Sequence, residues 1–211
     1  HRQFDTIYHE HFQYYTVASA LKALESGGLR LVDVELVPTH GGSIRLWARP
    51  EETDAPVGPA VADVLAEEAA AGLDTVEGHA GFAGEVSRIR NDLVRFLVDV
   101  ADAGRTVVGY GAPGKGNTLL NYCGIRPDLL AYTVDRNPYK HGRYTPGTRI
   151  PIHPPERIDA DRPDHVLVLP WNLREEITAQ LAHVADWGGT LVFPIPSLQV
   201  VEPGSGKVLD L

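Results

Sequence analysis

Residues 104–196 alternate between short apolar runs and longer segments with helical spacing. Such repetition of strand, helix and strand is built as a parallel sheet with right-handed crossovers. We therefore predict an α/β fold with a Rossmann-like parallel sheet in this part of the chain. The predicted strands cover 106–110, 129–134, 165–169 and 190–195, and the predicted helices cover 115–123 and 173–185.

The rest of the chain follows other patterns. Val17, Leu21 and Leu24 have helical spacing, and two β-rich runs come after them, at 29–37 and 43–48. The next segment is helical, because it is first rich in alanine and then carries apolar residues on one face. The sequence therefore predicts four parts, which are residues 1–50, a helical connecting segment at 51–103, the Rossmann-like domain at 104–200 and a loose tail at 201–211.

The net charge of −9 is concentrated in one part of the chain. Residues 51–103 hold three basic and twelve acidic residues, whereas the segments on either side are balanced. A solvated helical surface accounts for such a run of charge, and an acidic docking surface is the alternative. Binding of nucleic acid needs a basic surface, so no nucleic-acid partner is expected. No apolar run approaches the roughly 18 residues of a membrane helix, so no membrane partner is expected either.

The chain contains one cysteine, Cys123, and no methionine. A single cysteine builds neither a disulfide framework nor a cysteine-based zinc site, and a reducing, cytoplasmic location is expected. The first residues do not have the pattern of a signal peptide. Because the chain begins with His1 rather than methionine, we expect a fragment of a longer protein.

The most specific local feature is a glycine-rich loop between a predicted strand and a predicted helix. It reads Gly109-Tyr110-Gly111-Ala112-Pro113-Gly114-Lys115-Gly116-Asn117. Glycines let backbone N–H groups approach an anion closely, and a helix N-terminus adds a partial positive charge. Lys115 adds a full positive charge. We predict that the loop binds a phosphate-containing ligand and suits a diphosphate best, and a tight turn without a ligand is the alternative.

Two sequence motifs fit this loop in part. Gly109, Gly111 and Gly114 match the G-x-G-x-x-G of dinucleotide-binding folds, with Asp135 after the next strand as the ribose ligand. The loop also matches G-x-x-x-x-G-K, but Gly116 stands where an ATPase needs Ser or Thr to bind Mg²⁺. The first match supports an NAD-dependent oxidoreductase as one hypothesis, and an ATPase is not favoured.

Further polar residues follow the predicted strands at the same edge of the sheet, where open α/β sheets bind ligands. Asp135 or Asn137 could contact a ribose or a base, and Lys140 or His141 could contact a phosphate. A surface turn with scattered charges is the alternative for these four residues. Trp171, which precedes Asn172, would either stack on a base or cap the core.

The motif Tyr8-His9-Glu10-His11 lies in an aromatic-rich segment at the start of the chain. A histidine suits proton abstraction at neutral pH, and a tyrosine hydroxyl can stabilise a developing oxyanion. Glu10 could orient an imidazole or receive a proton. Two histidines with His40 could instead bind a metal, and structural packing is a third reading. The residues alone leave the choice open.

Taken together, five segments resemble one family. They are residues 4–12, 40–45, 109–121, 134–142 and 169–172. The chain resembles the three-domain S-adenosylmethionine-dependent C-methyltransferases that act on nucleotide-linked keto-deoxysugars, over roughly residues 1–196. In that family an N-terminal domain binds zinc through cysteines, a middle domain binds S-adenosylmethionine, and a C-terminal Rossmann-like domain holds the nucleotide-sugar.

The resemblance implies how the chain maps onto this family. Residues 1–50 would be the last elements of the class I methyltransferase domain, and residues 104–200 would bind the nucleotide-diphosphate sugar. The zinc domain is missing, and most of the S-adenosylmethionine site would lie outside this chain. The whole enzyme would methylate a carbon next to the ketone of the sugar, and the fragment alone is expected to be inactive.

The resemblance also implies residue roles. His11 would be the general base, with Glu10 as the alternative, while Tyr8 would stabilise the enolate and His9 would support the geometry. No metal ligand is expected in this chain. An NAD-dependent oxidoreductase and a non-catalytic nucleotide-sugar-binding module are the alternative functions. The expected substrate-binding residues are Gly111, Gly114, Lys115, Gly116, Asn117, Asp135, Asn137, Lys140, His141, Trp171 and Asn172.

Overall fold

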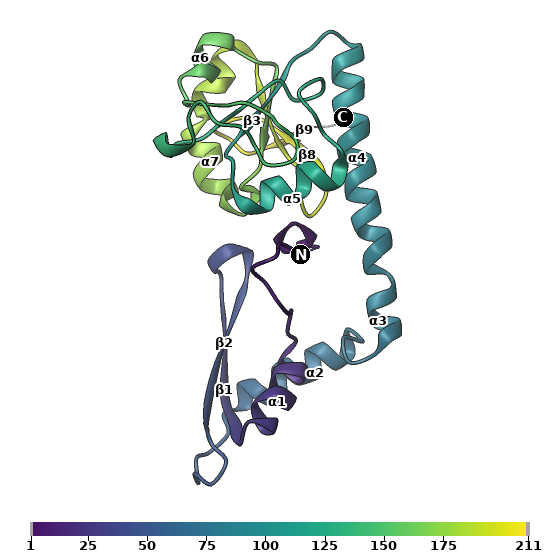
Figure 1. Ribbon diagram of the computed structural model, residues 1–211, viewed down its shortest axis with the longest axis vertical. Helices are drawn as coiled ribbons and strands as arrows, with labels where there is room; N and C mark the ends of the chain where they lie inside the picture. The colour runs from purple at the N-terminus through teal and green to yellow at the C-terminus, as the bar shows by residue number, and fades with distance from the viewer. Residues whose placement is uncertain (1, 210–211) are drawn as a thin grey trace. The chain divides into compact units, whose positions relative to one another are not determined.

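The computed structural model describes residues 2–209 and contains two compact units (Figure 1). One combines the start of the chain, up to His9, with the chain from Gly84 onward, and we call it the Rossmann unit. The other is Glu10–Ala83, which we call the hairpin unit. No helix within residues 2–209 is long and apolar enough to cross a membrane.

The hairpin unit consists of a two-stranded antiparallel sheet and helices that pack on it. The strands pair from Leu29 opposite Pro50 to Val37 opposite Ser43. Its small core buries Val17, Leu31, Val34 and Val61. In chain order the elements are α1 (Val17–Ser26), β1 (Leu29–Val37), η2 (Thr39–Gly41), β2 (Ser43–Pro50), α2 (Pro59–Ala70) and α3 (Val76–Ala80).

The Rossmann unit is built around a seven-stranded sheet with the order β5-β4-β3-β6-β7-β8-β9. The first five strands are parallel, and β8 and β9 are added antiparallel. Its elements are η1 (Phe4–Thr6), α4 (Phe82–Asp102), β3 (Val107–Tyr110), α5 (Gly114–Cys123), β4 (Thr133–Val134), η3 (Pro138–Lys140), β5 (Ile152–His153), α6 (Arg157–Asp161), β6 (His165–Val168), η4 (Trp171–Leu173), α7 (Arg174–Gln180), η5 (Ala182–Trp187), β7 (Thr190–Phe193), β8 (Gln199–Val201) and β9 (Val208–Leu209).

The strand order predicts a ligand crevice between β3 and β6. From β3 the chain moves to β4 on one side, and from β6 it moves to β7 on the other side. Right-handed crossovers therefore put α5 and α7 on opposite faces of the sheet. In this architecture ligands bind outside the carboxyl ends of the strands, at the point where the strand order reverses. The predicted Rossmann-like α/β fold is confirmed.

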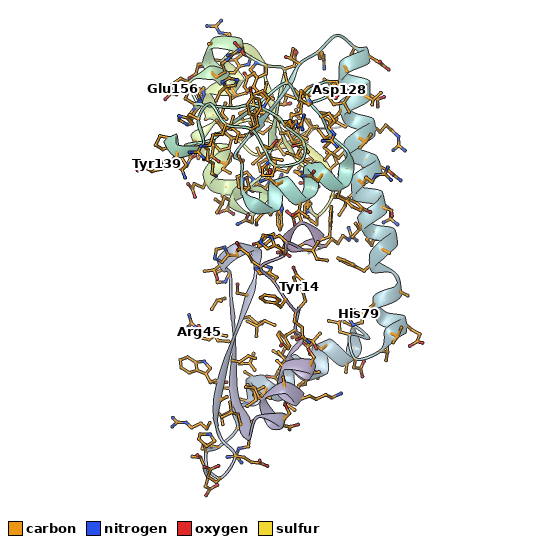
Figure 2. The ribbon with its side chains drawn as sticks, viewed as in Figure 1. Tyr14, Arg45, His79, Asp128, Tyr139 and Glu156 are labelled. Atoms are coloured by element: carbon orange, nitrogen blue, oxygen red, sulfur yellow. The ribbon has the colours of Figure 1, made fainter. Side chains whose placement is uncertain are left out.

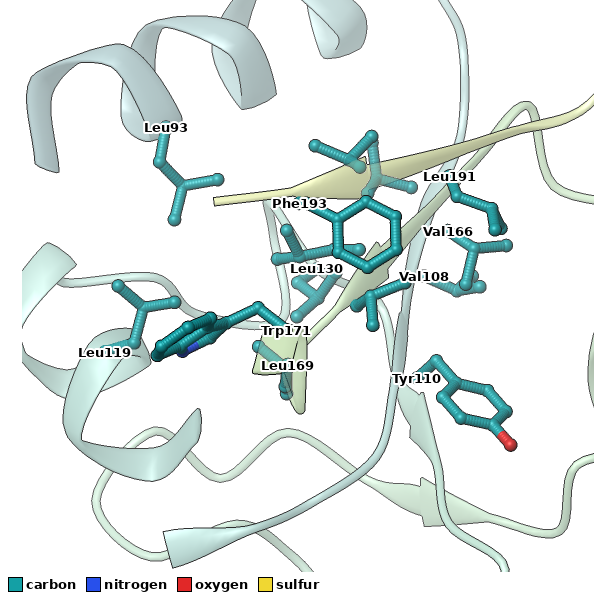
Figure 3. Packing of buried hydrophobic residues seen from close by; sticks show 14 of the residues in the cluster. Leu93, Val108, Tyr110, Leu119, Leu130, Val166, Leu169, Trp171, Leu191 and Phe193 are labelled. Carbon is teal, nitrogen blue, oxygen red and sulfur yellow. The ribbon is translucent and has the colours of Figure 1, made fainter. Parts of the chain in front are cut away.

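One continuous core supports that crevice. The amphipathic helix α4 buries one face, which includes Leu93 and Leu97, and the central strands β3 and β6 are buried along their whole length. Figure 3 shows the packing of Leu93, Leu119, Val166 and other members of this cluster. Close packing of this kind resists rearrangement, so the loops at the strand ends rest on a rigid base.

Three sequence expectations need correction or refinement. The strand expected at 129–134 contains only β4, because a turn closed by bonds from Leu129 N and Leu130 N to Arg126 O takes up its start. The expectation of a loose tail is wrong as far as Leu209, since β9 pairs with β8, while residues 210–211 lie outside the described part. The segment predicted at 51–103 is divided between the units: α2 packs on β1, and α4 joins the Rossmann core. The domain boundaries of the whole protein stay a prediction.

Candidate functional site

The glycine loop lies at the carboxyl end of β3, and internal packing explains two of its glycines. Gly111 has φ +83°, which glycine adopts without strain, and its N–H donates to Val134 O at 2.6 Å. A Cβ on Gly111 would lie 2.7 Å from Pro170 Cδ, and one on Gly109 would lie 2.6 Å from Thr133 Oγ1. These two positions are therefore glycines because neighbouring segments approach the backbone closely.

The other two glycines open the helix α5. A Cβ on Gly116 would lie 2.9 Å from Leu169 Cβ, so this glycine lets the helix pack against the end of β6. Gly114 is exposed, and Pro113, at the N-cap, makes no side-chain capping bond. The first-turn N–H groups of α5 thus have no side-chain cap, and the helix dipole makes their end of the helix favourable for an anion.

Lys115 adds charge to this helix start. Its Nζ donates to Asn172 Oδ1 at 2.6 Å and lies 4.8 Å from the centroid of the Trp171 ring. Burial lowers the pKa of Lys115, and the nearby carboxyl of Asp5 offsets part of that shift. The ammonium group is thus held against η4, which directly follows β6.

Asn117 follows in the second turn of α5 and has an unmet hydrogen bond. Its Oδ1 is buried and has no hydrogen-bond partner within the described chain. Buried polar atoms are nearly always paired, so an amide oxygen without a partner is an unusual feature of this helix start.

Asp135 and Lys140 brace the glycine loop. The Asp135 carboxylate accepts the N–H of Ala112 at 2.7 Å and that of Asn137 at 2.8 Å. Lys140 Nζ donates to Asp135 Oδ2 at 2.9 Å and to Ala112 O at 3.0 Å. Burial raises the pKa of Asp135, but the hydrogen bonds from Lys140 and the two N–H groups outweigh it and hold the pKa below its usual value. These side chains therefore fix the loop's backbone.

Two neighbours stabilise the turn after β4. His141 Nε2 lies 2.6 Å from Asp135 O, and Asn137 Oδ1 accepts the N–H of Tyr139 at 3.1 Å. Tyr139 itself is exposed (Figure 2). The polar residues predicted after β4 thus all lie near the loop, and the bonds described here join them to the protein's own groups.

Trp171 lies in the core rather than on an open surface. Its ring packs near Leu119 and Leu169 (Figure 3). The indole N–H donates to Asp5 Oδ2 at 2.6 Å. The sequence allowed Trp171 either to stack on a base or to cap the core, and in the structure the ring packs in the core.

Tyr8 and His9 belong to the Rossmann unit. The short helix η1 packs on α5, where the Phe4 ring meets the Tyr122 ring edge to face at 5.1 Å. A Cβ on Gly114 would lie 4.0 Å from Tyr8 Cε1, so the phenol ring lies beside the glycine loop. The sequence predicted a role for Tyr8, and the structure brings it to the predicted ligand site.

Glu10 and His11 belong to the hairpin unit. His11 is exposed, and its Nδ1 lies 3.3 Å from the Tyr14 hydroxyl. The boundary between the compact units therefore runs through the Tyr-His-Glu-His motif. As for the metal hypothesis with His40, the residues between 2 and 209 contain no group of three His, Cys, Asp or Glu side chains placed to hold a metal ion.

The fold is a Rossmann-like domain with a glycine loop and a helix start without a side-chain cap at the carboxyl end of β3. A family profile described as the C-methyltransferase C-terminal domain matches residues 38–196, and the chain belongs to this family. The chain is 40% identical over 203 residues to C-methyltransferase NovU of Streptomyces niveus. That match covers 96% of this chain and 48% of the relative, so the chain spans about half the relative's length.

Proposed function

We propose that the complete protein is an S-adenosylmethionine-dependent C-methyltransferase that adds a methyl group next to the ketone of a nucleotide-diphosphate keto-deoxysugar. The family supports the reaction type. Within it, we assign this chain the binding of the nucleotide-sugar. The observation that carries this assignment is the uncapped start of α5 at the β3–β6 crevice, with the Lys115 ammonium beside it.

A diphosphate uses these groups fully. The N–H groups of Gly114–Gly116 suit one phosphate, and the Lys115 ammonium suits the neighbouring one. The Asn117 amide oxygen, which has no partner among residues 2–209, would accept a hydrogen bond from a hydroxyl of the sugar or the ribose. Asp135 and Lys140 would act indirectly, because they hold the backbone of Ala112 in place.

The glycine loop does not fit the methyl donor. S-adenosylmethionine has no phosphate, and its sulfonium and ammonium cations outnumber its single carboxylate, whereas the loop gathers an ammonium group and the positive end of a helix dipole. We therefore propose that the donor site lies outside this chain, in the portion that the longer relative has in addition. The zinc domain of the family is likewise proposed for that portion.

The motif at the start of the chain would supply the proton chemistry. The ketone acidifies the neighbouring C–H bond, and we assign His11 as the base that removes this proton, with Glu10 as the alternative. The Tyr8 hydroxyl would donate a hydrogen bond to the enolate oxygen, and His9 would orient the segment.

The binding half of the proposal is tested with Lys115→Ala in this chain. Calorimetric titration should show that thymidine diphosphate or uridine diphosphate binds the wild type. The variant should bind about 10–100-fold more weakly, because a charge-assisted hydrogen bond contributes about 1.5–3 kcal/mol. Lys207→Ala, which removes an exposed lysine of the same unit, should bind as the wild type does. Binding of NAD in place of the diphosphates, or equal binding by both variants, would overturn the assignment.

The catalytic half is tested with His11→Asn in the full-length protein. If His11 is the base, methyl transfer should fall by roughly 10²–10⁴-fold. The matched variant is Glu10→Gln, which should retain most activity under this assignment. Loss in Glu10→Gln with full activity in His11→Asn would reverse the two roles, and full activity in both would remove the motif from the proton transfer.

A further inference from the structure

A buried aspartate lies three residues before Tyr8 and is not used by the function proposed above. The Asp5 side chain has no exposed surface. Its Oδ2 accepts the Trp171 indole N–H at 2.6 Å, and its Oδ1 has no hydrogen-bond partner among residues 2–209. Burying a carboxyl group with one unpaired oxygen is unfavourable, so the presence of an aspartate at this position calls for a physical reason.

Asp5 lies close to residues that we assign to ligand binding. Trp171 begins η4 directly after β6, and the next residue, Asn172, accepts the hydrogen bond from Lys115 Nζ at 2.6 Å. The Lys115 ammonium also lies over the Trp171 ring, and its charge lowers the pKa of Asp5 in part, although burial raises that pKa more. One pair of adjacent residues on η4 thus holds both the start of the chain and the cation of the glycine loop.

The segment around Asp5 is a short turn that its own backbone bonds hold in part, among them those from Ile7 N to Phe4 O at 3.1 Å and from Tyr8 N to Thr6 O at 3.0 Å. Its only regular element is η1, a single turn of three residues. Side-chain contacts that help to fix it include the Asp5–Trp171 bond, the Phe4–Tyr122 ring contact, a bond from Thr6 Oγ1 to Gln3 O at 2.8 Å, and an ion pair between the exposed Arg2 and the half-buried Glu85. The aspartate bond is directional and buried, whereas exposed ion pairs contribute little.

We propose that Asp5 is a positioning residue: its hydrogen bond to the Trp171 indole fixes the segment that carries Tyr8 and His9 beside the glycine loop. Tyr8 is three positions after Asp5, which is at most roughly 10 Å of extended chain. Anchoring Asp5 therefore restricts where the Tyr8 hydroxyl can reach. The inference rests on the proposed function for its catalytic consequence and on the structure for the anchor itself.

The anchor is tested in this chain by hydrogen exchange. In Asp5→Ala, the Trp171 indole N–H and the backbone N–H groups of residues 4–8 should exchange at least about tenfold faster than in the wild type, because the acceptor is gone. Asp5→Asn keeps an acceptor oxygen and should restore most of the protection. The control is Asp128→Ala, which removes an exposed aspartate of the same unit (Figure 2). Unchanged exchange in Asp5→Ala, or equal loss in Asp5→Asn and Asp5→Ala, would overturn the anchor.

The consequence for catalysis is tested in the full-length protein by separating kcat from KM. Misplacing a catalytic group by about 1 Å can cost roughly 10²-fold in rate. Asp5→Ala should therefore lower kcat by about 10–100-fold and change KM for the nucleotide-sugar less than about threefold, with recovery in Asp5→Asn. A raised KM with unchanged kcat would assign Asp5 to ligand binding through Lys115 and overturn the positioning role.

The two proposals fail in different ways. If the wild-type protein transfers no methyl group, the proposed function fails, and the exchange experiment still decides whether Asp5 is the anchor. If methyl transfer occurs and Asp5→Ala retains the wild-type kcat, the positioning role fails and the proposed function stands.

Discussion

At the scale of single residues, the buried imidazole of His165 links the stability of the Rossmann unit to pH. Its Nδ1 lies 2.7 Å from Thr190 Oγ1, its ring meets Phe96 edge to face, and its Nε2 is buried without a partner in the described chain. Burial lowers the pKa of His165, the nearby Asp164 opposes that shift, and Arg105 adds to it. The folded state therefore favours the neutral ring.

The sign of the pH effect follows from this lowered pKa. Below about pH 6.5 the unfolded chain binds a proton at this position that the folded chain resists, so stability is lost as the pH falls below that value. We predict that the free energy of unfolding falls between pH 7 and pH 5, with a contribution from His165 of at most about 1.4 kcal/mol per pH unit. Urea titrations at several pH values measure this slope.

The matched variants are His165→Asn and His183→Asn. The first should flatten the slope, since it removes the buried imidazole, and the second should leave it nearly unchanged, since His183 is exposed and its ion pair with Asp159 is on the surface. An equal slope in His165→Asn and the wild type would contradict this assignment.

The sequence predicted the ligand loop at this scale but not how its neighbours are used. Lys115 was recognisable because it stands inside a glycine-rich pattern. The inward direction of Asp135 and Lys140 depends on the fold of the turn after β4, which brings both side chains to Ala112. Asp5 could not be singled out, because its partner Trp171 is 166 positions away in the chain.

At the scale of elements, the start of α1 depends on a side chain from another helix. Glu68 of α2 is buried, and its carboxylate accepts the N–H of Val17 at 2.6 Å and that of Ala18 at 2.9 Å. Thr16 and Ser19 add a local capping box. Because Glu68 satisfies two N–H groups that otherwise lack acceptors, it joins α1 and α2 in the small core of the hairpin unit.

We predict that Glu68→Ala destabilises the hairpin unit by about 1–3 kcal/mol, since it leaves buried N–H groups without an acceptor. Glu67→Ala removes an exposed neighbour of the same helix and should change stability by less than about 0.5 kcal/mol. Circular dichroism during thermal unfolding measures both. Equal effects of the two changes would show that the cap carries no stability.

Elements with a strong repeating pattern were predictable, and elements made by distant pairing were not. The apolar face of α4 and the apolar runs of β3 and β6 specify these elements locally. By contrast, β8 and β9 form because Val200 pairs with Leu209 and Val201 with Val208, across a turn that has no strong strand signal. The shortness of β4 has the same origin, because a turn anchored on Arg126 O precedes it.

At the scale of the whole molecule, the two units have separate hydrophobic cores. The larger contains the sheet and α4, and the smaller contains Val17, Leu31, Val34 and Val61. The sequence indicated that the pattern of strands and helices changes along the chain. It did not indicate that residues 2–9 join the Rossmann unit, because that depends on the contacts of Phe4 and Asp5. Proteins with separate cores commonly unfold in more than one step.

We predict that a ligand and a mutation shift different unfolding steps of this chain. A nucleoside diphosphate at 100 times its dissociation constant should stabilise the Rossmann unit by about 2.7 kcal/mol, because the glycine loop and α5 belong to it. Glu68→Ala should instead lower the stability of the hairpin unit, where α1 and α2 lie. Hydrogen exchange followed by mass spectrometry distinguishes the two effects. The ligand should slow exchange in residues 84–209, and Glu68→Ala should speed exchange in residues 10–83. A single cooperative step that moves as a whole under both changes would contradict the independence of the cores.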